Sequence, residues 1–229
     1  MRKLSFDKSH IILWIILALF AAAVIAGAVA LKAESLSTQL KTDRPINVLL
    51  IFEQDGKPVS TQLLMFYASK SKAALLDIPS NTAVILKTIK RMDRIDYTYK
   101  AGNPKNFLTE VESYLDITLN GYLLFDEKGL AKTVDLLDGL PLFIPTMIVQ
   151  DGPPTVRLPG GAVTLDGEKV LQYLRYREES ESEADALVRR QKLAISLLKK
   201  LSEKSGYFID KAASSALVGG VGSTFSPDA

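Results

Sequence analysis

A continuous apolar segment near the N-terminus constrains this chain more than any other feature. Residues 11–31, with the sequence IILWIILALFAAAVIAGAVAL, contain no charged side chain. As a helix, this segment would extend roughly 30 Å, which is about the thickness of the hydrocarbon core of a bilayer. We therefore predict one membrane-spanning helix, so that the rest of the chain has to fold beside the membrane and not within it.

The charges that precede this segment predict its orientation. Three basic residues and one acidic residue lie in residues 1–10. The positive-inside rule then places residues 1–10 in the cytoplasm and everything after residue 31 outside the membrane. Cleavage is the alternative, because Ala28, Val29 and Ala30 resemble a signal-peptidase site, but the apolar segment is longer than the usual signal-peptide core. We expect an uncleaved, single-pass protein of the cell membrane with an extracytoplasmic main domain.

The predicted outer part of the chain has no net charge, no cysteine and no histidine. The chain has 28 basic and 26 acidic residues, and removing the three bases and one acid of residues 1–31 leaves 25 of each. A neutral domain has no bulk attraction to nucleic acid, so we expect no nucleic-acid partner. Disulfides and thiolate zinc sites are excluded, and the one histidine, His10, precedes the span. The remaining arginines, carboxylates and hydroxyls suit the recognition of anions.

Composition divides the outer part into three regions. Residues 32–45 are polar and end at Pro45, which suits a short stalk. Residues 46–206 contain the apolar patterns of a folded domain. Residues 207–229 contain much glycine and serine and too few large apolar residues to pack well. We therefore predict a stalk, one domain and a flexible tail.

The domain is predicted to belong to the α/β class. Short aliphatic runs at residues 46–52, 61–68 and 72–78 predict three strands, with a turn in the sequence EQDGKP between the first two. Helices are predicted where a capping residue precedes apolar residues at helical spacing: about 104–115 after Asn103, from Asp126 to Gly139, after Asp166, and at 183–204. Because strands and helices interleave, we expect a sandwich-like domain with a central mixed sheet flanked by helices.

Two arginines in the sequence LQYLRYREES, residues 171–180, are candidates for binding an anion. In an extended segment Arg175 and Arg177 project to the same face, so both guanidinium groups can converge on one phosphate. The same spacing suits a solvated loop in which they pair with the neighbouring acids Glu178, Glu179 and Glu181. The residues alone leave both interpretations open.

The last predicted helix contains a second candidate pair. Arg190 and Gln191 lie three and four positions after Leu187, beside the apolar stripe, and should therefore face the domain. Arg189 is expected on the opposite, solvated face. An arginine that faces inward needs an anion, although it can also extend past the stripe to reach water.

Several segments, taken in order, resemble one known family. They are INVLLI, STQLLMF, ALLDIPSNT, RIDYTYKAGN, TVDLLDGLPLFIP, LPGGAVTLDGEKVLQYLRYR and RRQKLAISLLKKL, and they cover about residues 46–201 behind the N-terminal span. The most specific stretch is LDGEKVLQYLRYR followed, thirteen residues after Arg177, by Arg190 and Gln191. In these segments the chain resembles the LytR-CpsA-Psr family.

The resemblance implies a membrane-anchored, extracytoplasmic phosphotransferase of cell wall biogenesis. Members of this family transfer glycopolymers from a polyprenyl pyrophosphate carrier to peptidoglycan, using magnesium and arginines around the pyrophosphate. By resemblance, Arg175 and Arg177 would be catalytic, and Arg190 and Gln191 would join them in binding substrate. The implied partners are the polyprenyl pyrophosphate-linked glycan, the membrane and a cell-wall polymer. The implied cofactor is Mg²⁺ if the protein is active.

The chain departs from the family pattern at positions that matter for phosphoryl transfer. Where the family has metal-binding aspartates, after the first strand and at the start of the second, this chain has Gln54 and Ser60. Two expected pyrophosphate arginines are replaced by Ser80 and Leu187, and an expected histidine by Tyr97. The metal ligands are therefore unknown.

These replacements remove groups that would neutralise charge on a transferred phosphoryl group. Asp55 or Asp77 would have to substitute as a metal ligand. The alternative to a transferase is a catalytically degenerate relative, a pseudoenzyme without a cofactor, that binds a lipid-linked precursor or an envelope partner without turnover. A third interpretation keeps only the fold, with a structural role.

Overall fold

A computed structural model describes residues 45–67, 70, 72–151, 155–178 and 180–204, and the backbone of 221–223. The predicted span at 11–31, nearly all of the stalk and most of the tail lie outside the described residues. Within the described ranges, no helix is both long and apolar enough to cross a bilayer.

The chain divides into two compact units. The first comprises residues 1–45 and 67–71, and its described part includes Lys70, whose ammonium lies 5.4 Å from the ring centre of Tyr67. The second comprises residues 46–66 and 72–229. The second unit contains the sheet and helices described below.

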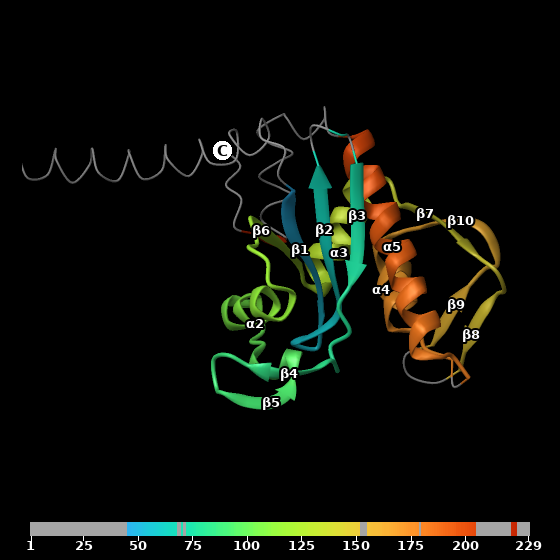
Figure 1. The fold of residues 1–229 in the computed structure, drawn as a ribbon. Coiled ribbons are helices and arrows are strands. Elements are labelled where there is room, and N and C mark those ends of the chain that lie inside the picture. Colours follow the sequence, from blue (N-terminus) through green and yellow to red (C-terminus); the bar gives the residue numbers. More distant parts are fainter. Residues whose placement is uncertain are drawn as a thin grey trace, which may run out of the picture. The chain divides into compact units, whose positions relative to one another are not determined.

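A five-stranded mixed sheet forms the centre of the second unit (Figure 1). Its strand order is β11 (Val221–Ser223), β6 (Gly121–Phe125), β1 (Ile46–Gln54), β2 (Lys57–Tyr67) and β3 (Lys72–Asp77). β1 pairs with β2 in the antiparallel sense and with β6 in the parallel sense, and β11 is antiparallel to β6. The α/β class, the mixed sheet and the three predicted strands are confirmed.

The turn between β1 and β2 is the tight turn that the sequence EQDGKP predicts. Gln54 pairs with Lys57, so that Asp55 and Gly56 form a two-residue loop. Both have positive φ angles, 48° and 70°. This conformation is that of a type I′ hairpin, for which Asp-Gly is a preferred sequence. The turn brings the end of β1 and the start of β2 to the same edge of the sheet.

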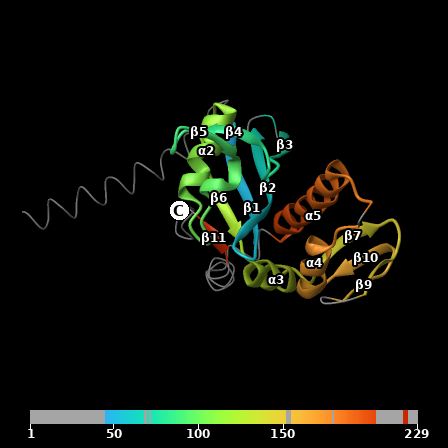
Figure 2. The same ribbon diagram turned by 90° about the horizontal axis from the view of Figure 1, so that it is seen from below.

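Helices cover both faces of the sheet (Figures 1 and 2). One face is covered by α2 (Lys105–Leu115), the 3₁₀ helix η2 (Ile95–Thr98) and the hairpin of β4 (Ala83–Leu86) and β5 (Arg91–Arg94). The other face is covered by α3 (Glu127–Leu136), α4 (Gly167–Arg175) and α5 (Glu183–Glu203). The predicted layers, helices on both sides of a sheet, are therefore present.

Alternating side chains of β1 assign the two cores. Leu49 and Ile51 pack with β4, η2 and α2, whereas Phe52 packs with α3, α4 and α5. Phe52 stacks on Phe125 of β6 with ring centres 5.5 Å apart. Because β1 is buried on both faces, its sequence is a continuous aliphatic run instead of an alternating one.

Two small hairpins complete the second core and were not predicted from the sequence. β7 (Leu140–Ile144) pairs with β10 (Gly161–Leu165), and β8 (Ile148–Gln150) pairs with β9 (Val156–Leu158). Along β7 buried and exposed residues alternate, with Phe143 exposed. This period of two was the available signal, interrupted by Pro141 within the strand and Pro145 just after it.

Side-chain caps begin three of the helices. Asp126 and Asp166 accept hydrogen bonds from the backbone nitrogens three residues later, at 2.6 and 2.9 Å, as predicted. Ser182 does the same for α5 at 3.1 Å. α2 begins after Pro104, one residue later than predicted, and the side chain of Asn103 accepts a hydrogen bond from the backbone nitrogen of Lys105, at 3.4 Å.

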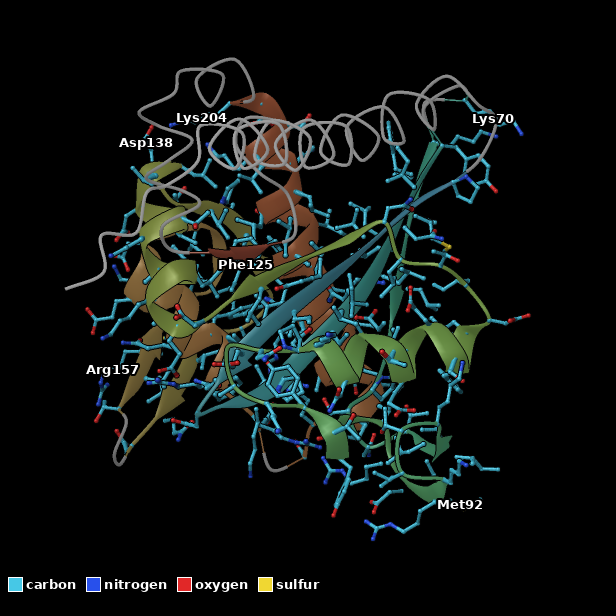
Figure 3. The ribbon with its side chains drawn as sticks, turned by 90° about the vertical axis from the view of Figure 1, so that its left-hand side faces the viewer. Lys70, Met92, Phe125, Asp138, Arg157 and Lys204 are labelled. Carbon is cyan, nitrogen blue, oxygen red and sulfur yellow. The ribbon has the colours of Figure 1, made fainter. Side chains whose placement is uncertain are left out.

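The end of α3 depends on a glycine. α3 ends at Leu136, and Gly139 adopts a φ of +87°. A Cβ at this glycine would lie 2.6 Å from the Thr164 methyl carbon. Nearby, Lys204 pairs with Asp138 at 2.5 Å, which holds the end of α5 to the end of α3 (Figure 3).

Candidate functional site

A pocket of about 240 Å³ lies at the end of the sheet where β2 begins. Residues from the start of β2, from the loop 78–81, from β5 and from the first turns of α5 line it. Ser60, Thr61, Arg94, Glu183 and Arg190 are its polar and charged members besides Ser80 and Asn81 of the loop. The pocket is therefore built by elements that are far apart in the sequence.

Three residues that line the pocket have a buried polar atom without a partner in the described residues. These atoms are Oγ of Ser60, Oγ1 of Thr61 and Nε of Arg190. Leaving such a group buried and unbonded costs about 1–3 kcal/mol. All three atoms can donate a hydrogen bond, so the arrangement suits a ligand rich in acceptor oxygens.

Arg190 faces inward, as the sequence predicts. It lines the pocket, and its Nε is buried without a partner among the described residues. Burial lowers the pKa of its guanidinium from the ordinary value, and the positive charge of Arg189 acts in the same direction. Both effects disfavour the charged form, so an anion placed here would relieve them.

Arg177 is connected to the pocket by an ion pair with a residue that lines it. Its guanidinium pairs with Glu183, at 2.7 Å, and Glu183 lines the pocket. The charges of Arg177 and Glu183 also act on Arg190. The structure thus brings Arg177 and Arg190 together around one carboxylate.

Arg175 is held elsewhere, and the predicted extended segment is not present at this position. Arg175 is the last residue of α4 and pairs with Glu127 in the first turn of α3. This pairing is the main reason why the pKa of Glu127 lies below its ordinary value, and the nearby Gln54 side chain contributes. Arg175 is not among the pocket-lining residues, so it and Arg177 do not converge on one partner.

The two arginines pair with acids on other elements. Arg175 pairs with Glu127 and Arg177 with Glu183. Pairing with Glu178, Glu179 and Glu181 was one of the two interpretations of the sequence, and of these acids Glu179 lies outside the described residues. Of those acids, Glu181 pairs with Arg189 instead. Arg175 and Arg177 pair with acids on other elements because α4 ends at Arg175 and the chain then turns toward α5.

Gln191 contributes to packing. Its Nε2 donates a hydrogen bond to the backbone oxygen of Leu75 at 3.4 Å. Leu75 lies on β3, the strand at the edge of the sheet. Gln191 therefore links α5 to this edge strand and does not line the pocket.

Arg189 is the residue that the sequence pattern misplaced. Its side chain is only 11% exposed, and it pairs with Glu181 at 2.8 Å. It also donates to the backbone oxygens of Tyr173 and Tyr176, whose rings lie 5.3 and 5.6 Å from its guanidinium carbon. The segment after α4 folds across the face of α5 that helical periodicity predicted to be solvated.

Ser80, Leu187 and Tyr97, at positions where the resemblance implies two arginines and a histidine, have different surroundings in the structure. Ser80 lines the pocket, but its hydroxyl donates to the backbone oxygen of Pro58 at 2.6 Å. Leu187 contributes an apolar wall. Tyr97 is 56% exposed and lies under the guanidinium of Arg91, at 4.7 Å.

Arg94 was not identified from the sequence, although the segment RIDYTYKAGN begins with it. It lines the pocket and forms a two-point ion pair with Asp96, at 2.9 and 2.6 Å. Its location on β5 became clear only from the pairing of β4 with β5.

The residues around the pocket do not fit a magnesium ion. Within the described part of the chain, no three or more Asp, Glu, His or Cys residues gather closely enough to hold a metal. Asp77 accepts a hydrogen bond from Gln62 at 2.9 Å, and burial raises its pKa. Asp55 is exposed in the β1–β2 turn. Mg²⁺ prefers carboxylate ligands, whereas the pocket lining offers one carboxylate, Glu183, which pairs with Arg177, beside hydroxyls, an amide and arginines.

A model of the LytR_cpsA_psr family matches residues 23–216 of this chain. A polyisoprenyl-teichoic acid–peptidoglycan teichoic acid transferase, TagU of Bacillus subtilis (strain 168), is 26% identical over 167 residues, which are 67% of this chain and 54% of that protein. The chain spans about half the length of the curated relatives that it matches.

Solved structures share the fold. The crystal structure of TagV from B. subtilis superposes with a TM-score of 0.68 at 19% identity, covering 82% of this chain and 76% of that one. The structure of TagT bound to LI-WTA superposes with a TM-score of 0.62 at 20% identity, covering 80% of this chain and 70% of that one. At these identities the likeness establishes the fold.

Proposed function

The chain belongs to the LytR-CpsA-Psr family, and from this premise we propose that it acts in cell-envelope assembly. The proposed reaction transfers a glycopolymer from a polyprenyl pyrophosphate carrier to peptidoglycan or an equivalent acceptor. The observation that carries the proposal is the pocket in which Arg190 and the unbonded hydroxyls of Ser60 and Thr61 meet. A diphosphate supplies the acceptor oxygens that these donors lack.

The pocket residues assign roles within this proposal. Arg190 binds one phosphate directly, and Ser60 and Thr61 donate to its oxygens. Arg177 joins them when the anion competes with Glu183 for its guanidinium. Arg175 acts as a positioning residue, because its partner Glu127 ties α4 to α3 beside Gln54.

In the transfer, the oxygen of an acceptor hydroxyl would attack the phosphorus of the glycan-bearing phosphate, the hydroxyl proton would pass to water, and the bond between this phosphorus and the oxygen of the lipid phosphate would break. Charge grows on the departing lipid phosphate. The guanidinium groups of Arg190, Arg177 and Arg94 are the cations available to stabilise it. Glu183 is a carboxylate of the pocket lining but pairs with Arg177, and no group of three or more metal-binding side chains gathers in the described part of the chain, so the proposed charge stabilisation falls to the arginines.

A second candidate function is binding without turnover. It is favoured by one observation: neutral groups, Gln54 and Ser60, occupy the positions where the resemblance implies metal-binding carboxylates. Such a protein would hold a lipid-linked precursor, or present it to a partner, at the cell membrane. Membrane attachment through residues 11–31 belongs to both candidates.

One experiment separates the two candidates. The full chain, reconstituted in nanodiscs, is given a radiolabelled polyprenyl pyrophosphate-linked glycan and peptidoglycan, and both bound glycan and released polyprenyl phosphate are measured. Transfer predicts binding and release, with both lost in Arg190→Ala and retained in Lys192→Ala, a charge removal at an exposed site on the same helix. Binding without release supports the second candidate. Absence of binding by the folded wild-type chain contradicts both.

A further inference from the structure

The β4–β5 hairpin presents an apolar face to solvent. Ile85 and Met92 are directly opposite each other on the two strands, and they are 72% and 70% exposed. The other side of the hairpin carries Val84 and Leu86, which are buried in the core with α2. Figure 3 shows Met92 on the outer side of this hairpin, away from the sheet.

Hydrogen bonds to a buried carboxylate of α2 hold the turn of the hairpin in place. Glu110 of α2 is 1% exposed and accepts hydrogen bonds from the backbone nitrogens of Lys87 and Thr88, at 2.6 and 2.9 Å. Burial alone would raise the pKa of Glu110, but these hydrogen bonds outweigh it and the pKa lies below the ordinary value. The carboxylate therefore stays ionised and fixes the loop that carries the exposed Ile89.

Basic residues outnumber acidic residues on the hairpin. Residues 83–96 contain four bases, Lys87, Lys90, Arg91 and Arg94, against two acids, Asp93 and Asp96. Arg91 and Arg94 pair with these two acids, and Lys87 and Lys90, in the turn between the strands, give the segment its net positive charge. At a second exposed apolar site, Phe143 and Met147, the segment 140–151 contains no base and one acid. An exposed apolar face on a positively charged hairpin matches a surface that is apolar inside and anionic outside, as an anionic bilayer is.

The apolar face also adjoins the pocket. Arg94 lies two residues after Met92 on β5, so both project to the same face of the hairpin, and Arg94 lines the pocket. A ligand carried by a membrane lipid would reach the pocket at this face.

We propose that the outer face of the β4–β5 hairpin rests on an anionic phospholipid bilayer, with Ile85, Ile89 and Met92 at the level of the headgroups. The proposed contact with the bilayer is argued from the exposure of the hairpin's apolar side chains and from its positive charge. Its link with the pocket, delivery of a lipid-borne phosphate, rests on the proposed function.

The test places a fluorophore on the hairpin. The chain has no cysteine, so Met92→Cys in the full-length protein gives a single labelling site for the dye NBD. The labelled chain is reconstituted in vesicles of phosphatidylglycerol and phosphatidylcholine that contain a nitroxide-bearing lipid. Phe143→Cys is the matched control, because Phe143 is 65% exposed and apolar but lacks basic neighbours.

We expect the label at residue 92 to shift to the blue and to be quenched at least about twofold more strongly than the label at 143. Adding Lys90→Gln and Arg91→Gln to Met92→Cys should lower the equilibrium constant for contact between the hairpin and the bilayer by about fivefold for each cation removed, and the quenching should fall accordingly. Ile85→Ser should weaken it as well. These side chains are exposed, so each variant is expected to keep the wild-type melting curve, which circular dichroism checks.

Three outcomes overturn the proposal. The first is equal quenching at residues 92 and 143. The second is quenching at 92 that is the same in phosphatidylcholine alone and unaffected by the loss of Lys90 and Arg91. The third is a spectral shift caused by a soluble anionic glycopolymer or a protein, without quenching by the lipid nitroxide. Glycan binding that depends on Arg190 is measured separately, so failure of the membrane contact leaves the pocket proposal standing, and the reverse holds.

Discussion

Arg189 and Arg190 are neighbours on α5, yet their guanidinium groups have opposite surroundings. Arg189 has Glu181 and two backbone oxygens as partners, and two tyrosine rings flank it. Arg190 has a buried Nε without a partner in the described residues, and it faces a pocket. The first guanidinium is used inside the chain to hold the segment after α4. The second is available for a ligand.

The comparison separates two reasons for burying an arginine. A buried charge with all its partners inside the protein maintains structure, and removing it leaves those partners unsatisfied. A buried charge with an open donor costs free energy in the unliganded protein, and a site that keeps it is organised for something that binds. The following predictions test this contrast.

The largest expected effect is on stability, for Arg189→Ala. The substitution leaves Glu181 and the backbone oxygens of Tyr173 and Tyr176 without their donor, and we expect the free energy of unfolding to fall by about 3 kcal/mol. Urea denaturation followed by circular dichroism measures the change. A loss below about 0.5 kcal/mol would mean that Arg189 is a surface residue in solution.

Arg190→Met should have the opposite profile. Methionine keeps much of the volume and removes the unbonded donor, so we expect stability to be unchanged or higher. Affinity for inorganic pyrophosphate should fall by about tenfold to a hundredfold, since a hydrogen bond to a charged group contributes about 1.5–3 kcal/mol. Titration calorimetry on the folded variant measures the affinity. Unchanged affinity together with lost stability would make Arg190 a structural residue like Arg189.

Magnesium should have little influence on this binding. The pocket supplies donors and no set of carboxylates, so chelation with EDTA is expected to leave pyrophosphate affinity within about twofold. The double substitution Gln54→Asp and Ser60→Asp should create a dependence on Mg²⁺ by adding two carboxylates. A strong magnesium requirement in the wild-type chain would contradict the assignment of a metal-free pocket.

The smallest expected effect concerns pH and the pair of Arg175 with Glu127. The pairing lowers the pKa of Glu127 from 4.5, so its contribution to stability is present above that value and is lost as pH falls through the lower pKa of the folded state. Both side chains are about one-third exposed, so the contribution is modest. The stability difference between wild type and Glu127→Gln should therefore shrink below about pH 4. A difference that grows on acidification would contradict this pairing.

Much of the fold follows from local patterns. Asp126 and Asp166 start helices because their side chains accept a backbone hydrogen bond three residues later, a relation visible within four letters of sequence. β1 is recognisable because nine successive positions, seven of them buried, are filled by a largely aliphatic segment. The β7–β10 and β8–β9 hairpins escaped prediction because the strands are short and prolines interrupt their alternation.

The candidate site was predictable only in part. Arg190 was found because its distance from Leu187 places it beside an apolar stripe. Arg94 and Glu183 were missed, since no local pattern shows that β5 and the start of α5 meet at the edge of β2. The separate partners of Arg175 and Arg177 also depend on where α4 ends.

The sequence by itself determined the class of the fold, the positions of the main helices and the family, because these depend on composition, spacing and motif order. The tertiary structure decided which arginines serve the pocket. Helical periodicity placed Arg189 in solvent, but the chain after α4 covers that face and converts it into an internal ion pair. Such pairings join residues that only folding brings within a few ångströms, where charge and hydrogen bonding act.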